Sequence, residues 1–225
     1  MADTGAGRGL PGGMRRVLAV VAHPDDESFG LGGLLALLSG SGVPTAVLCF
    51  THGEASTLHG RPGDLHALRA DELACAAREL GVERVELSGH PDGGLDRIPP
   101  HRLAGEVARL IDEQRPSHLL VFDLGGVTGH RDHQRATGAV LFAARGTGVA
   151  VVGWTLPRDV AERLNAEFGT SFLGRDPTEC RVVGPVPREW QGRAIACHAS
   201  QSSDNPVLRR RLELLGDREY LRVLE

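Results

Sequence analysis

Two short segments, far apart in the chain, carry side chains that could bind a metal ion and move protons. Residues 23–27 read His-Pro-Asp-Asp-Glu and directly follow an apolar run over residues 17–22. Such a run is typical of a buried strand. Packing does not explain the charges at its end, because unpaired charges are costly to bury. The carboxylates are therefore either solvated or held by a cation.

The second segment, residues 130–133, reads His-Arg-Asp-His. Two histidines three positions apart at the start of a helix share one face. With a histidine and an aspartate of the first segment, they make a set that contains a possible metal site of two histidines and one carboxylate. Zinc accepts these donors and keeps a position for water, and iron(II) fits the same set. The ligands alone leave the choice between the two metals open.

Two adjacent aspartates allow a division of roles, because neighbouring side chains on a turn point in different directions. One would bind the metal, and the other would face the water, whose pKa zinc lowers to about 7. That second carboxylate can act as a general base. The metal and an imidazolium of the second segment would stabilise the oxyanion. These parts predict metal-assisted amide hydrolysis.

Other interpretations fit each segment by itself. The first is also a sequence for a turn with a helix cap, and a His-x-x-His pair alone is a weak metal signal. The glycines at 30, 32 and 33 depart from the dinucleotide-binding spacing, and carboxylates at that turn would repel a pyrophosphate. Together the two segments favour a metal site over a nucleotide site.

Strands that alternate with helices predict an α/β fold with a Rossmann-like, mostly parallel sheet flanked by helices. Residues 1–13 are expected to be a disordered tail, and residues 14–225 a single domain with a small C-terminal extension. The predicted strands are Arg15–Ala22, Thr45–Phe50, Val82–Leu87, Ser117–Phe122, Val149–Trp154 and, at an edge, Glu179–Val183. The predicted helices are Leu31–Ser39, Leu65–Leu80, Pro100–Gln114, His133–Arg145, Pro157–Phe168, Trp190–His198 and Val207–Leu215.

Polar residues follow each of the first four predicted strands. Ligands of such sheets bind outside the carboxyl ends of the strands, so these side chains should converge on one rim. The long loop over residues 51–64 is a candidate lid for this rim. The converging residues are His23, His52, Glu54, His90, Asp92 and residues 130–133.

Composition restricts the class of protein. The 225 residues are 41% hydrophobic and carry a net charge of −4. The negative charge argues against a protein that binds nucleic acids or membrane surfaces. The absence of lysine excludes Schiff-base chemistry. No signal-peptide pattern and no apolar run near ~20 residues occur, so we expect no membrane span and a cytoplasmic location. Reduced thiols are expected, without disulfides, at Cys49, Cys75, Cys180 and Cys197.

The segments 22–27 and 129–136 resemble the PIG-L/LmbE-like zinc N-deacetylases. That family removes acetyl groups from N-acetylglucosamine compounds, and it includes deacetylases of mycothiol and bacillithiol synthesis and mycothiol-conjugate amidases. Further matching segments are residues 51–54, 69–81, 91–93 and 198–201. The resemblance implies that His23, Asp26 and His133 bind zinc. It implies that Asp25 is the general base and that His130 stabilises the oxyanion, or protonates the leaving amine.

The same resemblance implies supporting roles for other residues. Asp132 would orient an imidazole, with a helix cap as the alternative, and Glu27 would support the site or be only a helix-terminal charge. Arg69 and Asp92 would contact substrate hydroxyls, although Arg69 could instead form a surface ion pair. His198 would face the pocket or merely pack.

Two positions depart from the family pattern. Arg131 stands where many relatives have proline, and Thr128 stands where some sugar deacetylases have tyrosine. A phenol is therefore not expected to help stabilise the oxyanion.

The leading hypothesis is a zinc hydrolase that removes an acetyl group from a small-molecule amino-sugar conjugate. One rival is an amidase that acts on a thiol conjugate or a secondary-metabolite intermediate. A rival of another class is a catalytically silent sugar-binding or metal-binding module.

Overall fold

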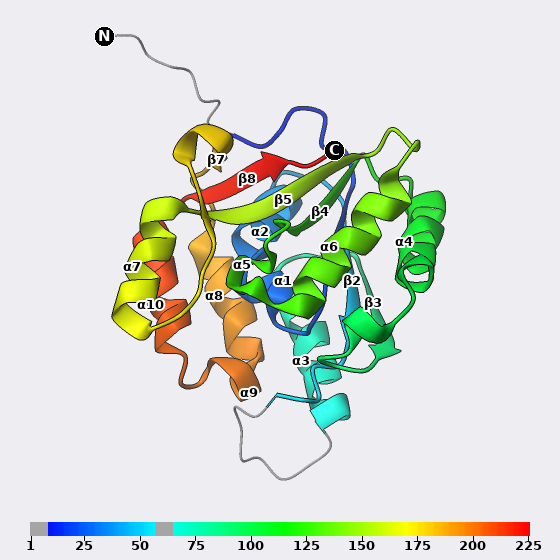
Figure 1. Ribbon diagram of the computed structural model, residues 1–225. Helices are drawn as coiled ribbons and strands as arrows, with labels where there is room; N and C mark the ends of the chain where they lie inside the picture. The colour runs from blue at the N-terminus through cyan, green and yellow to red at the C-terminus, as the bar shows by residue number, and fades with distance from the viewer. Residues whose placement is uncertain (1–8, 57–64) are drawn as a thin grey trace, which may run out of the picture.

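The structure, a computed structural model, describes residues 9–56 and 65–225. Its centre is an eight-stranded sheet in which seven strands follow the order β3-β2-β1-β4-β5-β8-β7, while β6 (Gly174–Arg175) pairs with β5 (Figure 1). The first five strands run parallel to one another. They are β1 (Val17–Val21), β2 (Thr45–Thr51), β3 (Arg84–His90), β4 (His118–Phe122) and β5 (Ala150–Pro157).

Strand β1 lies between β2 and β4, so the chain adds strands first on one side of β1 and then on the other. In sheets of this kind the crevice at the carboxyl ends of the two strands on either side of the reversal is the usual ligand site. The loops after β1 and β4 carry the two segments singled out in the sequence. The topology therefore brings together residues that are far apart in the chain.

Alternation along β1 sends its side chains into two separate cores. Val17, Ala19 and Val21 pack with the helices of one face, and Leu18 and Val20 pack with those of the other. The first face is covered by α2 (Gly32–Gly40), α3 (Leu65–Glu79) and α8 (Arg188–Cys197), with α7 (Arg158–Phe168) and α10 (Pro206–Leu215) beside them. The second face is covered by α4 (Pro100–Gln114) and α6 (Arg131–Ala144).

The predicted fold class is confirmed, and every predicted strand and helix is present; the helix over Pro100–Gln114 has the predicted ends, and the others have shifted ends. The predicted edge strand is β7 (Arg181–Val183). The sequence reading missed β8 (Glu219–Val223), which runs antiparallel between β5 and β7. It also missed three single-turn helices, because four residues are too few to show a helical period. These are α1 (Asp26–Phe29), α5 (Gly126–Gly129) and α9 (Ala199–Ser202).

The prediction of four reduced thiols is wrong for one pair. Cys75 on α3 and Cys197 on α8 form a disulfide, with their Cα atoms 5.8 Å apart. Packing of α3 against α8 joins positions separated by 122 residues, a proximity that cysteine spacing does not reveal. Cys49 and Cys180 are free, as expected, and both are buried.

Two further expectations concern the ends of the chain and the membrane. The predicted tail lies outside the described residues up to position 8, while the carbonyl of Gly9 accepts a hydrogen bond of 3.0 Å from Nε of Arg181. The boundary between tail and domain stays a prediction. Across residues 9–56 and 65–225 no helix combines the length and the apolar character needed to cross a bilayer.

Candidate metal and catalytic site

A cavity of about 450 Å³ opens where the loops after β1, β2, β3 and β4 meet. Of the polar residues expected to converge on this rim, His23, Asp92, His130 and His133 line the cavity. The rings of His52 and His90 turn aside, to the carbonyl of His66 and to Glu106, and Glu54 accepts the backbone N–H of Asp92. The cavity is lined by His23, Asp25, Asp26, Ala55, Ser56, Arg69, Asp92, Gly93, His130 and His133.

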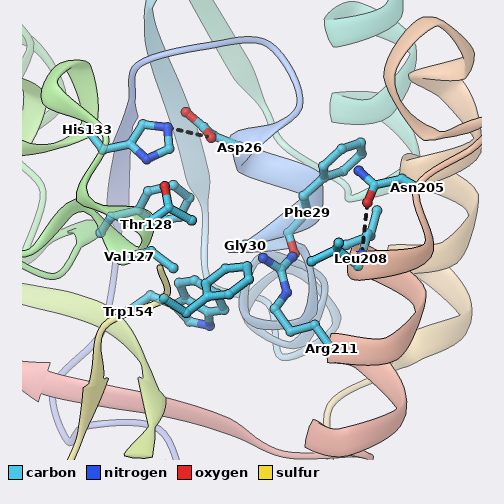
Figure 2. A pocket seen from close by; sticks show the side chains of 13 residues that line it. Asp26, Phe29, Gly30, Val127, Thr128, His133, Trp154, Asn205, Leu208 and Arg211 are labelled. Carbon is cyan, nitrogen blue, oxygen red and sulfur yellow. Dashed lines mark hydrogen bonds and ion pairs between the residues drawn. The ribbon is translucent and has the colours of Figure 1, made fainter. Parts of the chain in front are cut away.

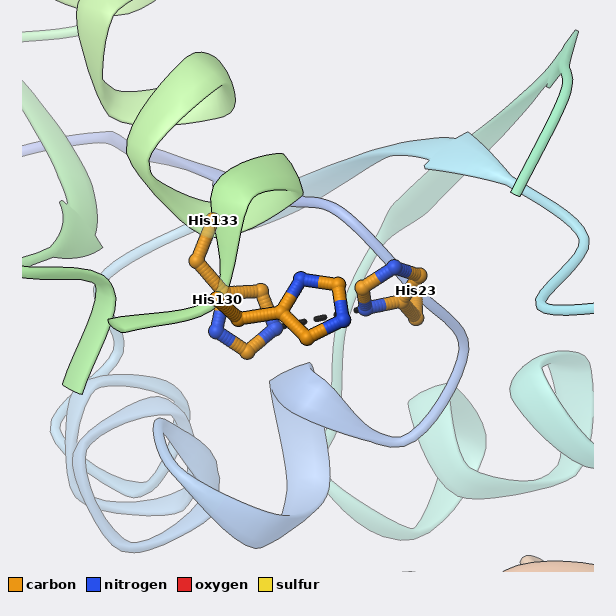
Figure 3. A group of neighbouring side chains, drawn as sticks. All are labelled: His23, His130 and His133. Atoms are coloured by element: carbon orange, nitrogen blue, oxygen red, sulfur yellow. Dashed lines mark hydrogen bonds between the residues drawn. The ribbon is translucent and has the colours of Figure 1, made fainter. Parts of the chain in front are cut away.

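Three donor groups face one another at the centre of this cavity. Nδ1 of His23 lies 3.2 Å from Nε2 of His133 and 3.5 Å from a carboxylate oxygen of Asp26. The other oxygen of Asp26 lies 3.1 Å from the same Nε2 of His133. Figure 3 shows the rings of His23 and His133 meeting from opposite sides, with the His130 ring beside them.

Hydrogen bonds fix which ring nitrogens face the centre with a lone pair. Nε2 of His23 approaches the carboxylates of Asp92 at 3.0 Å and Asp132 at 3.3 Å, so this nitrogen carries the proton. Nδ1 of His133 donates to the carbonyl of Gly126 at 3.1 Å. In the neutral rings, Nδ1 of His23 and Nε2 of His133 are therefore acceptors, and both face Asp26. Three acceptors pointed at one place are the arrangement that a cation satisfies.

The separations fit a tetrahedral ion. Ligand bonds of 2.0–2.2 Å place the donors of tetrahedral zinc about 3.3 Å from one another. The observed separations of 3.1, 3.2 and 3.5 Å lie around this value, with one oxygen of Asp26 approaching His133 and the other approaching His23. Donor atoms of His130 also lie within 4.8 Å of those of His23 and His133, and Asp92 and Asp132 flank the far side of the His23 ring. The predicted set of His23, Asp26 and His133 is thus compact enough to hold zinc or iron(II).

The two imidazoles favour a positive charge at this place, which a proton supplies when no metal ion is bound. Burial alone would lower the pKa of His23, yet its hydrogen bonds to Asp132, Asp26 and Asp92 hold the pKa well above its ordinary value. Burial opposes ionisation of Asp26, but His133 and His23 hold the pKa of this carboxyl well below its usual range. Backbone N–H groups of residues 22 and 23 also donate to Asp26. The carboxylate is therefore ionised and fixed.

Asp25 points to a different side of the loop from Asp26, as the division of roles requires. Its backbone adopts φ 115° and ψ −30°, a region that non-glycine residues rarely occupy. Its Oδ2 accepts a 2.9 Å hydrogen bond from Nη2 of Arg69. Burial and the charge of Asp26 raise the pKa of Asp25 to about 7, although Arg69 acts in the opposite direction. A carboxyl group tuned in this way can take a proton near neutral pH.

Arg69, predicted to contact substrate, is 2% exposed and holds the loop that carries Asp25. Besides Asp25 its guanidinium donates to the carbonyl of Pro24 and, at 2.5 Å, to that of Gly53. Gly53 has φ +66°, and a Cβ there would lie 2.2 Å from the guanidinium, so only glycine fits. The Arg69 side chain also borders the cavity, so its contact with a substrate stays a prediction.

Glu27 and His198 form a fully buried pair behind Asp25. Oε1 of Glu27 lies 2.6 Å from Nε2 of His198, and Oε2 accepts the backbone N–H of Asp25 at 2.9 Å. Burial opposes protonation of His198, but Glu27 raises the pKa of the imidazole above its ordinary value. His198 does not line the cavity. Its imidazole lies beneath the loop that carries Asp25.

Two motifs of the sequence meet beside this pair. Ser200 donates to Glu72 through its backbone N–H at 2.8 Å and through its hydroxyl at 2.6 Å. The segments around Arg69 and His198 are thereby joined, which the sequence reading did not predict.

His130 caps the start of α6 at the edge of the cavity. Its Nδ1 accepts the backbone N–H of Asp132 at 3.2 Å, so in the neutral ring the proton sits on Nε2. Burial, together with His133 and His23, lowers the pKa of His130 below its ordinary value. The imidazole is exposed and neutral near pH 7, and it is able to donate from Nε2.

Asp132 and Asp92 connect His23 to the loop after β3. Asp132 accepts the backbone N–H of Gly93 at 2.8 Å and that of Leu95 at 3.1 Å, in addition to its contact with His23. Asp92 accepts the N–H of Ala55 at 3.0 Å. The imidazole that Asp132 was predicted to orient is therefore His23. Contact of Asp92 with substrate stays a prediction.

A second pocket of about 150 Å³ shares Asp26 and His133 with the first. Figure 2 shows Thr128 beside His133 and Arg211 of α10 reaching in between Trp154 and Leu208. Sequence reasoning missed this pocket, since its walls come from elements spread across the chain and Arg211 belongs to no motif. The exposed Arg131 lies outside both pockets, 3.6 Å from Asp96.

Comparison with known proteins places this geometry in a family context. A family model described as PIG-L, GlcNAc-PI de-N-acetylase, matches residues 18–144, more than half of the chain. A 1D-myo-inositol 2-acetamido-2-deoxy-alpha-D-glucopyranoside deacetylase of Nakamurella multipartita is 34% identical over 93% of this chain and 89% of its own. A probable N-acetyl-alpha-D-glucosaminyl L-malate deacetylase 2 of Bacillus anthracis is 33% identical over 83% and 81%. The 1D-myo-inositol 2-acetamido-2-deoxy-alpha-D-glucopyranoside deacetylase of Kineococcus radiotolerans is 32% identical over 66% of this chain. That match covers 50% of the Kineococcus protein.

Solved structures show the same fold. The zinc-inhibited form of teicoplanin deacetylase Orf2 superposes with a TM-score of 0.68 at 21% identity, over 92% of this chain and 97% of that one. GalB, the 4-carboxy-2-hydroxymuconate hydratase of Pseudomonas putida KT2440, superposes with a TM-score of 0.70 at 18% identity, over 94% and 97%. The fold is thus shared with proteins that perform different reactions, and it does not by itself define the reaction here.

Proposed function

Because the chain belongs to the PIG-L family, we propose that it is a metal-dependent hydrolase that removes an N-acyl group, acetyl in the simplest case, from an N-acetylglucosamine-type conjugate. One observation carries the proposal. The lone pairs of His23 and His133 and the carboxylate of Asp26 converge on one place, and Asp25, a carboxyl with a pKa of about 7, borders the same cavity.

Each residue has a proposed role in hydrolysis. His23, Asp26 and His133 hold the metal ion, which when bound supplies a Lewis acid for the acyl oxygen and the water. Asp25 takes a proton from the attacking water as the water oxygen bonds to the acyl carbon. His130 donates from Nε2 to the developing oxyanion. The C–N bond then breaks, and the amine nitrogen takes the proton from Asp25 or His130.

The remaining polar residues keep this arrangement in place. Asp132 and Asp92 hold the proton on Nε2 of His23 and so leave Nδ1 free for the metal. Arg69 and Glu27 fix the loop that carries Asp25 from two sides. In this proposal Arg69 and His198 act through the base rather than on the substrate directly.

Zinc is the proposed ion. Two imidazoles and one carboxylate leave a fourth tetrahedral position for water or substrate, as catalytic zinc requires. Iron(II) binds the same donors, so metal analysis decides between them.

The proposed ligand is a small-molecule amino-sugar conjugate. Relatives named for an inositol glycoside and for an L-malate glycoside are similarly identical to this chain, so neither aglycone is favoured. An amidase of thiol conjugates or of a secondary-metabolite intermediate uses the same chemistry on a different amine. A silent binding module is disfavoured, because binding alone does not require a tuned carboxyl beside the metal donors.

A cytoplasmic location stays part of the proposal. The Cys75–Cys197 disulfide argues against a cytoplasmic location, since disulfides persist mainly in oxidising compartments.

The proposal is tested by metal content and by acetate release. Protein purified without added metal should hold about one zinc or iron per chain, and it should release acetate from at least one member of a panel of N-acetylglucosamine conjugates. Asp25→Asn should keep the metal and lose about 10²–10⁴-fold in kcat. Asp112→Asn, which removes an exposed carboxylate on α4, is the matched control and should behave as wild type. Full turnover in Asp25→Asn would exclude Asp25 as the base.

A further inference from the structure

The second pocket has an apolar body and one buried cation. Its volume of about 150 Å³ matches that of an engineered protein cavity that binds benzene. Seven apolar side chains form most of its wall, and Arg211 enters from α10 (Figure 2). These seven residues are Phe29, Phe122, Val127, Trp154, Phe172, Val207 and Leu208.

Arg211 is incompletely satisfied. The side chain is 9% exposed, and its Nη2 donates to the carbonyl of Phe29 at 2.5 Å. Its Nε is buried without a hydrogen-bond partner, and within the described parts of the chain no carboxylate lies within 4.0 Å of the guanidinium. Its other contact is the face of Trp154, 5.3 Å from the guanidinium carbon.

The carboxylate of Glu219 does not neutralise Arg211 by direct contact. Its two oxygens are engaged by Arg188 and, at 2.6 Å, by Nε1 of Trp154. Burial lowers the pKa of Arg211 to about 10 even though Glu219 acts to raise it. A buried guanidinium without a paired carboxylate costs free energy, and such residues are usually paired by an anion.

We propose that the Arg211 pocket is a carboxylate-binding subsite, which takes a monocarboxylate carried on a small apolar body about the size of a six-membered ring. The planar guanidinium matches a carboxylate, and the apolar walls take the body. A single negative charge suits one cation, and Asp26 at the other end of the pocket disfavours a second.

The location suggests which carboxylate this is. The pocket and the catalytic cavity share Asp26 and His133, so a group bound there is part of the acyl chain under hydrolysis or a separate acid beside it. We assign it to the far carboxylate of an acyl group longer than acetyl, an assignment that rests on the proposed function. The subsite itself does not depend on that function.

The subsite is tested first by direct binding to the zinc-loaded full chain. Calorimetry should show benzoate binding at least about tenfold more tightly than its neutral isostere benzamide. Arg211→Gln keeps a donor for the Phe29 carbonyl and removes the charge, so it should abolish this preference. The matched control is Arg210→Gln, which removes the same charge from a neighbouring arginine that faces Glu167 instead of the pocket. That variant should bind benzoate as wild type does.

A second variant guards against failure of Arg211→Gln to fold. Val207→Trp fills the pocket while leaving Arg211 in place, and it should weaken benzoate binding by the same factor. Benzoate that binds equally to wild type, Arg211→Gln and Val207→Trp sits on the metal instead and overturns the subsite, as does an absence of benzoate binding to folded wild-type protein.

The assignment to the acyl chain has its own readout. N-succinyl and N-acetyl glucosamine conjugates are compared, and Arg211→Gln should lower kcat/KM about tenfold for the succinyl compound alone. Equal losses for both compounds, or none, would overturn this assignment. Benzoate binding without hydrolysis of any conjugate would refute the proposed function and keep the subsite. Hydrolysis without benzoate binding would refute the subsite and keep the proposed function.

Discussion

Replacing Arg69 with methionine tests how the base is tuned. The change keeps an unbranched side chain of similar length and removes the charge that lies 2.9 Å from Oδ2 of Asp25. A neighbouring opposite charge lowers a carboxyl pKa by about 1–3 pH units. The pKa of Asp25, about 7 with Arg69 present, should therefore rise by that amount in Arg69→Met.

The expected loss follows from the ionised fraction of the base. With a pKa of about 7, about half of Asp25 is ionised at pH 7, and a rise of 1–3 pH units leaves about 10% to 0.1%. The value of kcat/KM at pH 7 should then fall between about 5- and 500-fold and recover at higher pH. The general base must be deprotonated to act, so the limb that moves is the acid limb, where activity rises with pH.

The assay is a pH profile of kcat/KM for acetate release, with Arg78→Met as the control. Arg78 lies on the same helix, α3, and is exposed, so its removal should leave the acid limb where it is. The Pro24 and Gly53 carbonyls lose their donor in Arg69→Met, at about 1–3 kcal/mol each if they stay buried, so a thermal melt must show a folded variant. An unmoved acid limb with a raised KM at every pH would refute the reasoning and favour direct contact of Arg69 with substrate.

Two further predictions concern the metal donors and the cysteines. Asp132→Asn removes the charge that holds Nε2 of His23 protonated, so zinc affinity should fall about 10–100-fold in a chelator competition; unchanged affinity would separate Asp132 from the metal. Thiol titration of the unfolded, unreduced protein should find two free thiols, and four after reduction, because Cys75 is joined to Cys197; four before reduction would contradict the pairing.

The first five strands, their parallel arrangement and the convergence of loops on one rim could be predicted from the sequence. Strands β1, β2 and β4 are mostly apolar, β3 (Arg84–His90) mixes apolar with polar residues, and polar residues follow each of the first four strands, so residue type and position carry the information. Strand β8 could not be found in this way. It has charged residues at two of its five positions, and its antiparallel pairing with β5 and β7 identifies it.

The candidate site divides along the same line. Residue types and spacing predict a metal site made from the two segments, because a metal demands particular atoms, and the resemblance to the PIG-L/LmbE-like family assigns His23, Asp26 and His133 as its donors. They do not reveal what supports the donors. The role of Arg69 depends on where α3 packs, and the position of His198 depends on α8 lying behind the base loop. Arg211 stands out only once its burial and its missing partner are known.

The backbone conformation of Asp25 affects both the stability of the fold and the reaction at this site. A conformation of φ 115° costs a non-glycine residue about 1–3 kcal/mol, while glycine adopts it freely. Asp25→Gly should therefore unfold at a higher temperature than Asp25→Ala, the reverse of the order that these two residues show at an ordinary position. Only a side chain can take the proton, so the residue that relaxes the loop is also one that cannot perform the reaction. The strained backbone at Asp25 therefore lowers the stability of the fold, and it does so to hold one carboxyl group in position for the reaction.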